Sequence, residues 1–365
     1  MAATRTRRVD LLRPWTAWVP LLGAVVLAFA WGKHPGDAVL IAMAPLLAGV
    51  IFASVHHAEV VAHKIGEPFG SLLLAIAVTV IEVGLIVMLM TSDKDTATLA
   101  RDTVFAAVMI CLNGIVGMVL LVGALKHHLA RFNPEGTGAA LATVITLAFV
   151  TLVLPRFSTS ERGPEFTPAQ LAFAATASLA LYGLFVFTQT VRHREFFVSV
   201  GDEVDEEQDN HEVTGAEARW SLALLLISLV GVVGLAKLES GGIEHLVRAA
   251  GLPQAVVGVI IALMVLAPES IAAVRAAALD RVQTGLNLAY GSAMASIGLT
   301  IPAIAVAMIW LDGPLTLGLA PVQIVLLVMS CFVGILTVVP GRAQTLQGGV
   351  HLAILAAFVF LSIAP

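Results

Sequence analysis

The feature that most constrains this chain is a series of apolar runs, each long enough to cross a bilayer as a helix. Crossing the hydrocarbon core takes about 20 mostly apolar residues in a helix. Such runs lie near residues 15–32, 38–55, 70–91, 103–125, 138–155, 168–190, 219–237, 253–274, 286–310, 316–338 and 345–363. This pattern predicts an all-α polytopic membrane protein with about 11 transmembrane helices.

The composition agrees with a chain whose solvent is lipid. Charged residues make up 12% of the sequence, whereas soluble domains carry roughly 25%. Cys111 and Cys331 both lie inside apolar runs, so we expect small core residues and no disulfide. The sequence has no glycine-rich phosphate loop, nucleophile elbow or Cys-x-x-Cys motif. We therefore expect no enzyme activity, no cofactor and no nucleic-acid partner.

One connection is long and acidic, and it divides the chain into halves. Residues 191–218 contain the segment Gly-Asp-Glu-Val-Asp-Glu-Glu-Gln-Asp-Asn-His-Glu. The predicted organisation is an N-terminal segment with a peripheral helix (1–37), a first five-helix repeat (38–190), this loop, and a second five-helix repeat (219–365). We interpret the loop as solvation and charge balance, with a calcium-concentrating or regulatory role as the alternative.

The distribution of Lys and Arg predicts the orientation. With the N-terminus in the cytoplasm, 13 of the 20 Lys and Arg residues fall on the cytoplasmic side, as the positive-inside rule requires. The C-terminus is then outside, and the acidic loop is cytoplasmic. Because five helices per half is an odd number, the two repeats must have opposite topology. The first run follows a basic segment, so it reads either as a signal peptide or as a retained first helix.

Two glutamates lie inside apolar runs, at matching places of the two halves. Gly66-Glu67-Pro68 precedes the run that contains Glu82, and Gly251-Leu252-Pro253 precedes the run that contains Glu269. A charge at membrane depth costs at least about 2.5 kcal/mol, so such an acid indicates a functional site. Two acids in corresponding places of two halves predict the central site of a transporter.

Paired carboxylates can exchange cations for protons. Burial disfavours the ionised form of a carboxyl group, and two nearby carboxylates cannot both stay ionised without a cation. Hard cations such as Ca²⁺ or Na⁺ prefer oxygen ligands. We therefore predict that Glu82 and Glu269 bind protons and a metal cation in alternation. Inorganic cations, protons and the lipid bilayer are the expected partners, and the oligomeric state is left open.

Other residues could complete this site. Pro268 directly precedes Glu269, and a proline inside a helix predicts a bend or break there. A second break is expected near Gly84. Small polar residues in the same or the next helix are candidate lining groups, with helix packing as the alternative role. These are Thr79, Asn113, Ser292 and Ser296.

The segment His56-His57-Ala58-Glu59-Val60-Val61-Ala62-His63 supports a competing hypothesis. In a helix, His56, Glu59 and His63 share one face. We favour an interfacial helix in which His63, Glu59 and the nearby Glu67 sense pH or admit ions and protons. The alternative is a zinc centre on His56, Glu59 and His63, which would make the chain a membrane-embedded metalloenzyme.

At these residues the chain resembles the calcium/cation antiporter superfamily, and most of all its bacterial Cha-type calcium/proton and sodium-potassium/proton antiporters. The resemblance runs from about residue 38 to the end of the chain. The stretches that carry it are Ala58-Glu59, Gly66-Glu67, Gly70, Glu82, Pro268-Glu269, Gly291-Ser292, Pro302, Gly341-Arg342 and Leu346-Gln347-Gly348.

The resemblance implies one peripheral helix plus two inverted five-helix repeats in a bacterial inner membrane, with Glu82 and Glu269 binding cation and proton in turn. The wider family reads Gly-Asn-x-x-Glu at both acids, whereas this chain has Val78-Thr79 and Val265-Leu266 there. Fewer oxygen ligands would favour Na⁺ or K⁺. We predict a secondary antiporter that exports Ca²⁺, and also Na⁺ or K⁺, in exchange for protons. An exchanger of monovalent cations without calcium activity and a passive channel are the open alternatives.

Overall fold

The structure is a computed structural model that describes residues 15–33, 36–66, 69–90, 97–161, 163–198, 213–310 and 315–364. Within these residues, nine helical segments are long and apolar enough to cross a membrane, and two shorter apolar helices cover Trp15–Ala30 and Leu72–Met88. All of them coincide with predicted runs. The predicted all-α polytopic architecture, a peripheral helix followed by two five-helix sets, is therefore confirmed.

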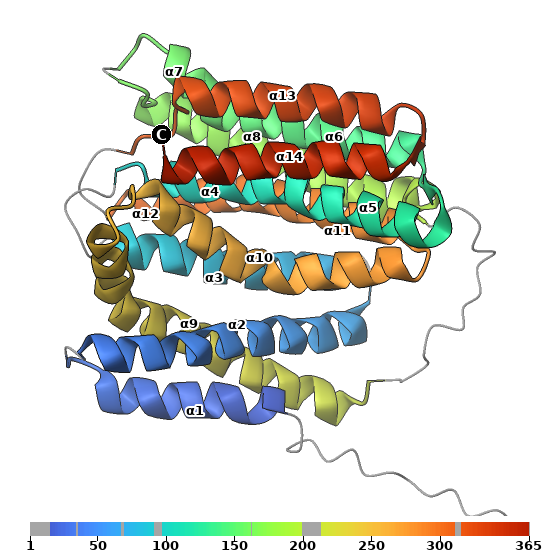
Figure 1. The fold of residues 1–365 in the computed structure, drawn as a ribbon. Coiled ribbons are helices and arrows are strands. Elements are labelled where there is room, and N and C mark those ends of the chain that lie inside the picture. The colour runs from blue at the N-terminus through green and yellow to red at the C-terminus, as the bar shows by residue number, and fades with distance from the viewer. Residues whose placement is uncertain are drawn as a thin grey trace, which may run out of the picture. The chain divides into compact units, whose positions relative to one another are not determined.

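The helices group into two compact units, and the first comprises Met1–Ala77 and His211–Glu239. Its described helices are α1 (Trp15–Ala30), α2 (Asp37–Ile65), the beginning of α3 (Phe69–Met90) and most of α9 (Gly215–Ala249). α1 packs along α2, as Figure 1 shows. A ring nitrogen of His57, Nε2, lies 3.0 Å from the carbonyl oxygen of Thr16. This contact gives the buried His57 ring a polar partner on the neighbouring helix.

The second unit comprises Val78–Asn210 and Ser240–Pro365, and it includes the later parts of α3 and α9. Its other elements are α4 (Leu99–Met109), η1 (Ile110–Ile115), α5 (Val116–His127), β1 (Ala130–Arg131), α6 (Pro134–Ala148), η2 (Phe149–Val153), α7 (Leu154–Phe157), α8 (Pro168–Phe187), η3 (Thr188–Arg192), η4 (Arg194–Phe197), α10 (Ala255–Ala278), α11 (Val282–Gly298), α12 (Thr300–Ala307), α13 (Pro321–Val338), β2 (Arg342–Ala343) and α14 (Thr345–Ile363).

Three membrane segments of the second unit contain π-helical turns, which the sequence analysis did not anticipate. These turns are η1, η2 and η3. Only η1 has all of its residues buried. A π-helical turn inserts one residue into the helical ladder and occurs frequently at functional sites. The buried position of η1 in the middle of the segment formed by α4, η1 and α5 therefore indicates a functional region.

Two short backbone contacts join the two halves of the sequence within the second unit. β1 pairs antiparallel with β2, so that Ala130 faces Ala343 and Arg131 faces Arg342. A single bridge joins Glu165 to Thr316. β1 precedes α6, the fourth helix of the first half, and β2 precedes α14, the fifth helix of the second half.

The bridge between Glu165 and Thr316 also joins the start of a fourth helix to the start of a fifth helix, but the two halves of the sequence exchange roles. Thr316 precedes α13, the fourth helix of the second half, and Glu165 precedes α8, the fifth helix of the first half. The two contacts also lie at opposite ends of the helices that separate them along the chain. This is the arrangement that two inverted repeats produce.

The five tryptophans all lie near helix ends. Trp15 and Trp18 stand in the first turns of α1, and Trp31 directly follows that helix. Trp220 lies near the start of α9, and Trp310 follows α12. All five side chains are exposed. Tryptophan is enriched where a transmembrane helix meets the membrane interface, so these positions agree with the assigned spans.

Candidate functional site

The carboxyl group of Glu82 lies in α3 and is only 2% exposed. Its Oε2 accepts a hydrogen bond from Oγ of Ser296 at 3.1 Å and another from Oγ1 of Thr300 at 3.0 Å. Its other oxygen, Oε1, is buried and makes no hydrogen bond with the part of the chain that the structure describes. One oxygen is thus held by two hydroxyl donors, and the other is available to a ligand.

The two hydroxyl donors flank an interruption in their helix. α11 ends at Gly298 and α12 begins at Thr300, with Leu299 between them. Pro302 explains the interruption, because proline has no N–H to donate to the carbonyl of Gly298 four residues earlier. Ser296 and Thr300 are four residues apart and therefore lie on one side of the segment. Both can then reach the same oxygen of Glu82.

Glu269 lies in α10 and is also buried. Pro268 sits inside this helix, which runs without interruption from Ala255 to Ala278. The predicted helix break at Pro268 is therefore wrong, as is the predicted break near Gly84, because α3 also continues through that residue. One missing backbone hydrogen bond is a small loss in a long helix that packs against α4, η1, α5, α11 and α14.

The two acids share one buried neighbourhood. α10, which carries Glu269, packs against α11, which carries the Ser296 donor to Glu82, and both helices pack against η1. Cys111, in η1, is completely buried. α10 packs against α4 so closely that a Cβ atom on Gly258 would lie 2.9 Å from the backbone nitrogen of Thr103. The structure thus places Glu269 and the hydrogen-bond partner of Glu82 on helices that pack around η1.

Asn113 also belongs to η1 and is completely buried. Its Nδ2 donates to Oγ of Ser330 in α13 at 2.9 Å. Its Oδ1 is buried and makes no hydrogen bond with any described residue. Asn113 therefore lies in the predicted region, but its amide donor is directed to α13 and not to either glutamate.

The remaining predicted lining residues give a mixed result. Ser296 contacts Glu82 as expected. Thr79 is buried one turn before Glu82, and Ser292 is partly exposed one turn before Ser296. Sequence reasoning missed Thr300. The signal that could have found it is a hydroxyl residue one turn after Ser296 and just before Pro302.

The His56–His63 segment is the last part of α2, which runs on to Ile65. The predicted interfacial helix is thus the end of this long helix, and its role in sensing pH or admitting ions stays a prediction. The side chains of His56, Glu59 and His63 are exposed, and Glu67 lies outside the described residues. Within the described ranges, no group of three His, Cys, Asp or Glu residues is arranged to hold a metal ion. The alternative of a zinc centre on this segment has no support from the structure.

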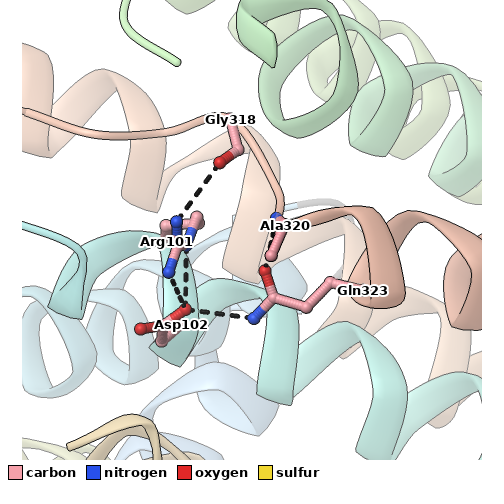
Figure 2. A network of polar contacts seen from close by, with 5 residues as sticks. All are labelled: Arg101, Asp102, Gly318, Ala320 and Gln323. Carbon is pink, nitrogen blue, oxygen red and sulfur yellow. Dashed lines mark hydrogen bonds and ion pairs between the residues drawn. The ribbon is translucent and has the colours of Figure 1, made fainter. Parts of the chain in front are cut away.

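Two polar clusters fix the beginnings of the helices that carry the site. The first, the Asp102 cluster, stands at the start of α4 (Figure 2). Oδ1 of the buried Asp102 accepts from Nε of Arg101 at 2.8 Å and from Nε2 of Gln323 at 3.1 Å. Oε1 of Gln323 accepts from the backbone N–H of Ala320 at 2.9 Å, and Nη1 of Arg101 donates to the carbonyl of Gly318 at 3.3 Å. This cluster joins α4 to the start of α13.

The second, the Gln283 cluster, stands at the start of α11. Oε1 of the buried Gln283 accepts from the backbone N–H of Asn133 at 2.7 Å, and its Nε2 donates to Oδ1 of Asn287 at 2.8 Å. Nδ2 of Asn287 donates to the carbonyl of Phe197 at 2.6 Å. Asn133 is the N-cap of α6. The two clusters are therefore related in the same way as the strand contacts, because each joins the third segment of one half to the fourth helix of the other.

Comparison with known proteins gives this arrangement a context. A relative from Sinorhizobium fredii, "Putative ionic transporter y4hA", is 44% identical over 96% of both chains. The "Sodium-potassium/proton antiporter ChaA" of Escherichia coli is 33% identical over 93% of both chains. A "Ca(2+)/H(+) antiporter" of Aphanothece halophytica is 24% identical, covering 84% of this chain and 86% of that protein.

A solved structure and a family model agree with these relatives. The structure titled "Structure of native YfkE" has the same fold, with a TM-score of 0.71, 16% sequence identity, and coverage of 96% of this chain and 100% of that chain. The family model described as "Sodium/calcium exchanger protein" matches residues 37–191 and 220–364. The protein is thus a multi-pass membrane antiporter of cations and not an enzyme. The chain belongs to the sodium/calcium exchanger protein family, within the calcium/cation antiporter superfamily.

Proposed function

We propose that this protein exports Ca²⁺ in exchange for protons, and that Glu82 and Glu269 bind the cation and the protons in alternation. The observation that carries the proposal is that the two buried acids belong to neighbouring helices from different halves: α10 carries Glu269 and packs against α11, whose Ser296 donates to Glu82. When both are ionised they carry two negative charges, which one divalent cation balances. When both are protonated they are neutral, and burial then costs little.

The partners of Glu82 fit this alternation. The hydroxyls of Ser296 and Thr300 donate to Oε2, which stabilises the ionised carboxylate at the moment when a cation needs it. Oε1 is left for the cation or the proton. Cation binding from the cytoplasm releases the protons, and proton binding from outside releases the cation. The inward proton gradient then drives export.

A second candidate is exchange of Na⁺ or K⁺ for protons, without calcium activity. Its support is the sodium-potassium/proton activity that the name of the Escherichia coli relative gives to that protein. The positions three residues before the two acids hold Thr79 and Leu266. Leu266 offers no side-chain oxygen, and a cation with less demand for oxygen ligands suits such a site.

We further propose that the protein lies in a bacterial inner membrane, with a cytoplasmic N-terminus and an external C-terminus. The support is the excess of Lys and Arg, 13 of 20, in the segments that this orientation places in the cytoplasm. Reporter fusions after Pro365 and inside residues 199–212 test it. For the fusion after Pro365, activity of a reporter that functions only in the cytoplasm would contradict this orientation.

The test of function uses everted membrane vesicles from cells that express the protein. The vesicle interior is acidified, Ca²⁺, Na⁺ or K⁺ is added in turn, and collapse of the pH gradient is followed. We expect Ca²⁺ to discharge the gradient in the wild type and not in Glu82→Gln or Glu269→Gln. Glu135→Gln, an exposed acid at the start of α6, is the control and should behave as the wild type.

Each other outcome identifies a rival. Discharge by Na⁺ or K⁺ alone selects the monovalent exchanger. Cation flux that does not depend on a pH gradient selects a passive channel. Retained exchange in both glutamine variants, with confirmed membrane insertion, would refute the role proposed for Glu82 and Glu269.

A further inference from the structure

Two arginines face each other across the short contact between β1 and β2. In the antiparallel register Arg131 lies opposite Arg342, and Ala130 lies opposite Ala343. Both alanines are buried, whereas both arginines are exposed. Residues directly opposite in an antiparallel pair have their side chains on the same face. The two strands therefore form a ribbon with an alanine face turned into the protein and an arginine face turned outward.

This register brings two positive charges together. Residues directly opposite have Cβ atoms about 4.5–5.5 Å apart, and like charges in such positions destabilise the pair. Neither guanidinium group forms an ion pair with any residue that the structure describes, including Glu135, the nearest acid along the chain. An anion from outside the chain would remove the repulsion between the two groups.

Two helices begin directly after the arginines. α6 begins at Pro134 and α14 begins at Thr345, so each starts three residues after its arginine. The amino end of a helix carries a partial positive charge that favours a nearby anion. The two helix ends thus add to the positive potential that the arginines create on this face.

The ribbon lies where four membrane segments end. β1 separates the segments Leu99–His127 and Pro134–Phe157, and β2 separates Pro321–Val338 and Thr345–Ile363. Each connection is only a few residues long, so the arginines stand at the level of the lipid headgroups. In the orientation proposed above, this end of the protein faces the cytoplasm.

Exposed leucines lie on the two helices that adjoin the ribbon. Leu125, in the last turn of α5, is 65% exposed, and Leu346, in the first turn of α14, is 70% exposed. α5 and α14 lie side by side (Figure 1), and a Cβ atom on Gly348 would lie 2.6 Å from the backbone nitrogen of Leu121. Exposed leucines on membrane-spanning helices face acyl chains, so the arginines stand next to an apolar surface.

We propose that Arg131 and Arg342 together bind the phosphate of an anionic phospholipid, whose acyl chains lie against the exposed leucines of α5 and α14. The planar guanidinium group presents paired N–H donors that match the oxygens of a phosphate. Basic groups at the cytoplasmic ends of membrane helices are typical binding sites for such headgroups. Because the ribbon joins the two halves of the sequence, the bound lipid stabilises the junction between them. The site binds lipid whichever cation the protein exchanges.

The test measures thermal unfolding of the purified full-length protein in a neutral detergent. Dioctanoyl phosphatidylglycerol, dioctanoyl phosphatidylcholine and inorganic phosphate are titrated separately. We expect phosphatidylglycerol alone to raise the unfolding temperature, because a ligand that binds only the folded state stabilises it. In the double variant Arg131→Gln with Arg342→Gln, the lipid concentration for the half-maximal rise should increase about tenfold or more. Arg156→Gln removes an exposed arginine at the end of another membrane segment, and it should behave as the wild type.

The sign of the effect without lipid separates lipid binding from a structural role. The double glutamine variant lacks the repulsion between the arginines, so without lipid it should unfold at the same temperature as the wild type or higher. A structural role predicts a lower temperature. The double variant Arg131→Lys with Arg342→Lys keeps both charges and loses the paired donors, and it should keep only part of the rise with phosphatidylglycerol.

Four results would overturn the assignment. An equal rise with phosphatidylcholine would show that the headgroup charge is not recognised. An equal rise with inorganic phosphate would indicate a site for free anions and not for lipid. A full rise in the double glutamine variant would place the lipid elsewhere on the protein. Unfolding of that variant at a lower temperature without lipid, or its failure to fold, would show that the arginines are structural.

Discussion

Oγ1 of Thr300 donates to Oε2 of Glu82 at 3.0 Å, across 218 residues of sequence. Together with Ser296 it places the third membrane segment of the second half against the acid of the first half. The surroundings of the Glu82 carboxyl group are therefore built by both halves of the chain.

Removing the Thr300 hydroxyl should weaken the cation site. Thr300→Val keeps the shape of the side chain and removes the donor. A hydrogen bond to a charged group contributes about 1.5–3 kcal/mol, so we expect cation affinity to fall about tenfold or more. Ser296→Ala should have a similar effect. Cation titration of purified protein is the measurement, and Thr143→Val, whose exposed hydroxyl bonds only within its own helix, is the control. Wild-type affinity in Thr300→Val would contradict this role.

Restoring a backbone donor at Pro302 should impair exchange. Pro302→Ala allows residue 302 to donate to the carbonyl of Gly298 and so favours a continuous helix. A continuous helix would stiffen the segment that carries both donors to Glu82, and we expect the exchange rate to fall several-fold while the protein stays folded. Pro321→Ala is the matched control, because Pro321 stands at the start of α13, where a missing donor costs nothing. Equal rates in the two variants would argue against the interruption as a functional feature.

The Asp102 cluster should contribute mainly to stability. Asp102→Ala leaves the largely buried guanidinium of Arg101 without its carboxylate, and breaking a buried ion pair costs about 3–5 kcal/mol. Gln323→Ala removes one hydrogen bond to Asp102 and one from the N–H of Ala320, and we expect a loss of about 2 kcal/mol. Thermal unfolding in detergent is the measurement, and Asp102→Ala should unfold at a lower temperature than Gln323→Ala. A larger loss in Gln323→Ala than in Asp102→Ala would contradict the ion pair as the main contribution.

Neighbouring glycines in α14 should differ sharply in their tolerance of a methyl group. In Gly348→Ala the new Cβ would lie 2.6 Å from the backbone nitrogen of Leu121, so α14 must move away from α5. Overpacking of this kind costs about 1–3 kcal/mol. Gly349 has open space around the same position, so Gly349→Ala should be neutral. The yield of monodisperse protein after solubilisation measures both, and similar yields would show that the helices are not in such close contact.

The sequence predicted the helices and the acids well because both depend on the bilayer. A run of apolar residues has few alternatives in lipid, and Glu82 and Glu269 stand out because a charge there is costly. Gly66 and Gly251, which precede the two acid-bearing helices, both adopt positive φ angles of 77° and 68°. Glycine is the residue that adopts such a conformation at no steric cost. The Gly-x-Pro repeat in the sequence therefore has a structural basis.

The details of the site could not be predicted from local pattern. Pro268 and Pro302 give the same signal in sequence, yet only the helix near Pro302 is interrupted. Packing of α10 against α11, α14 and the segment formed by α4, η1 and α5 keeps it continuous. The π-helical turn η1 has no sequence signature of its own, so its position against α10 and α11, the helices that carry Glu269 and the Ser296 donor to Glu82, is visible only in the folded protein.

The two strand contacts have a consequence for how the protein is made. Ala130, Arg131 and Glu165 leave the ribosome long before their partners Thr316, Arg342 and Ala343 exist. The first half therefore enters the membrane with the backbone groups of β1 and Glu165, on either side of α6, not yet paired with their partners. Contacts between distant parts of a chain form late. Assembly is completed only when the final helix, α14, has been inserted. A ribosome that stalls before that point leaves a chain whose earlier helices are in the membrane but whose two halves are not yet joined.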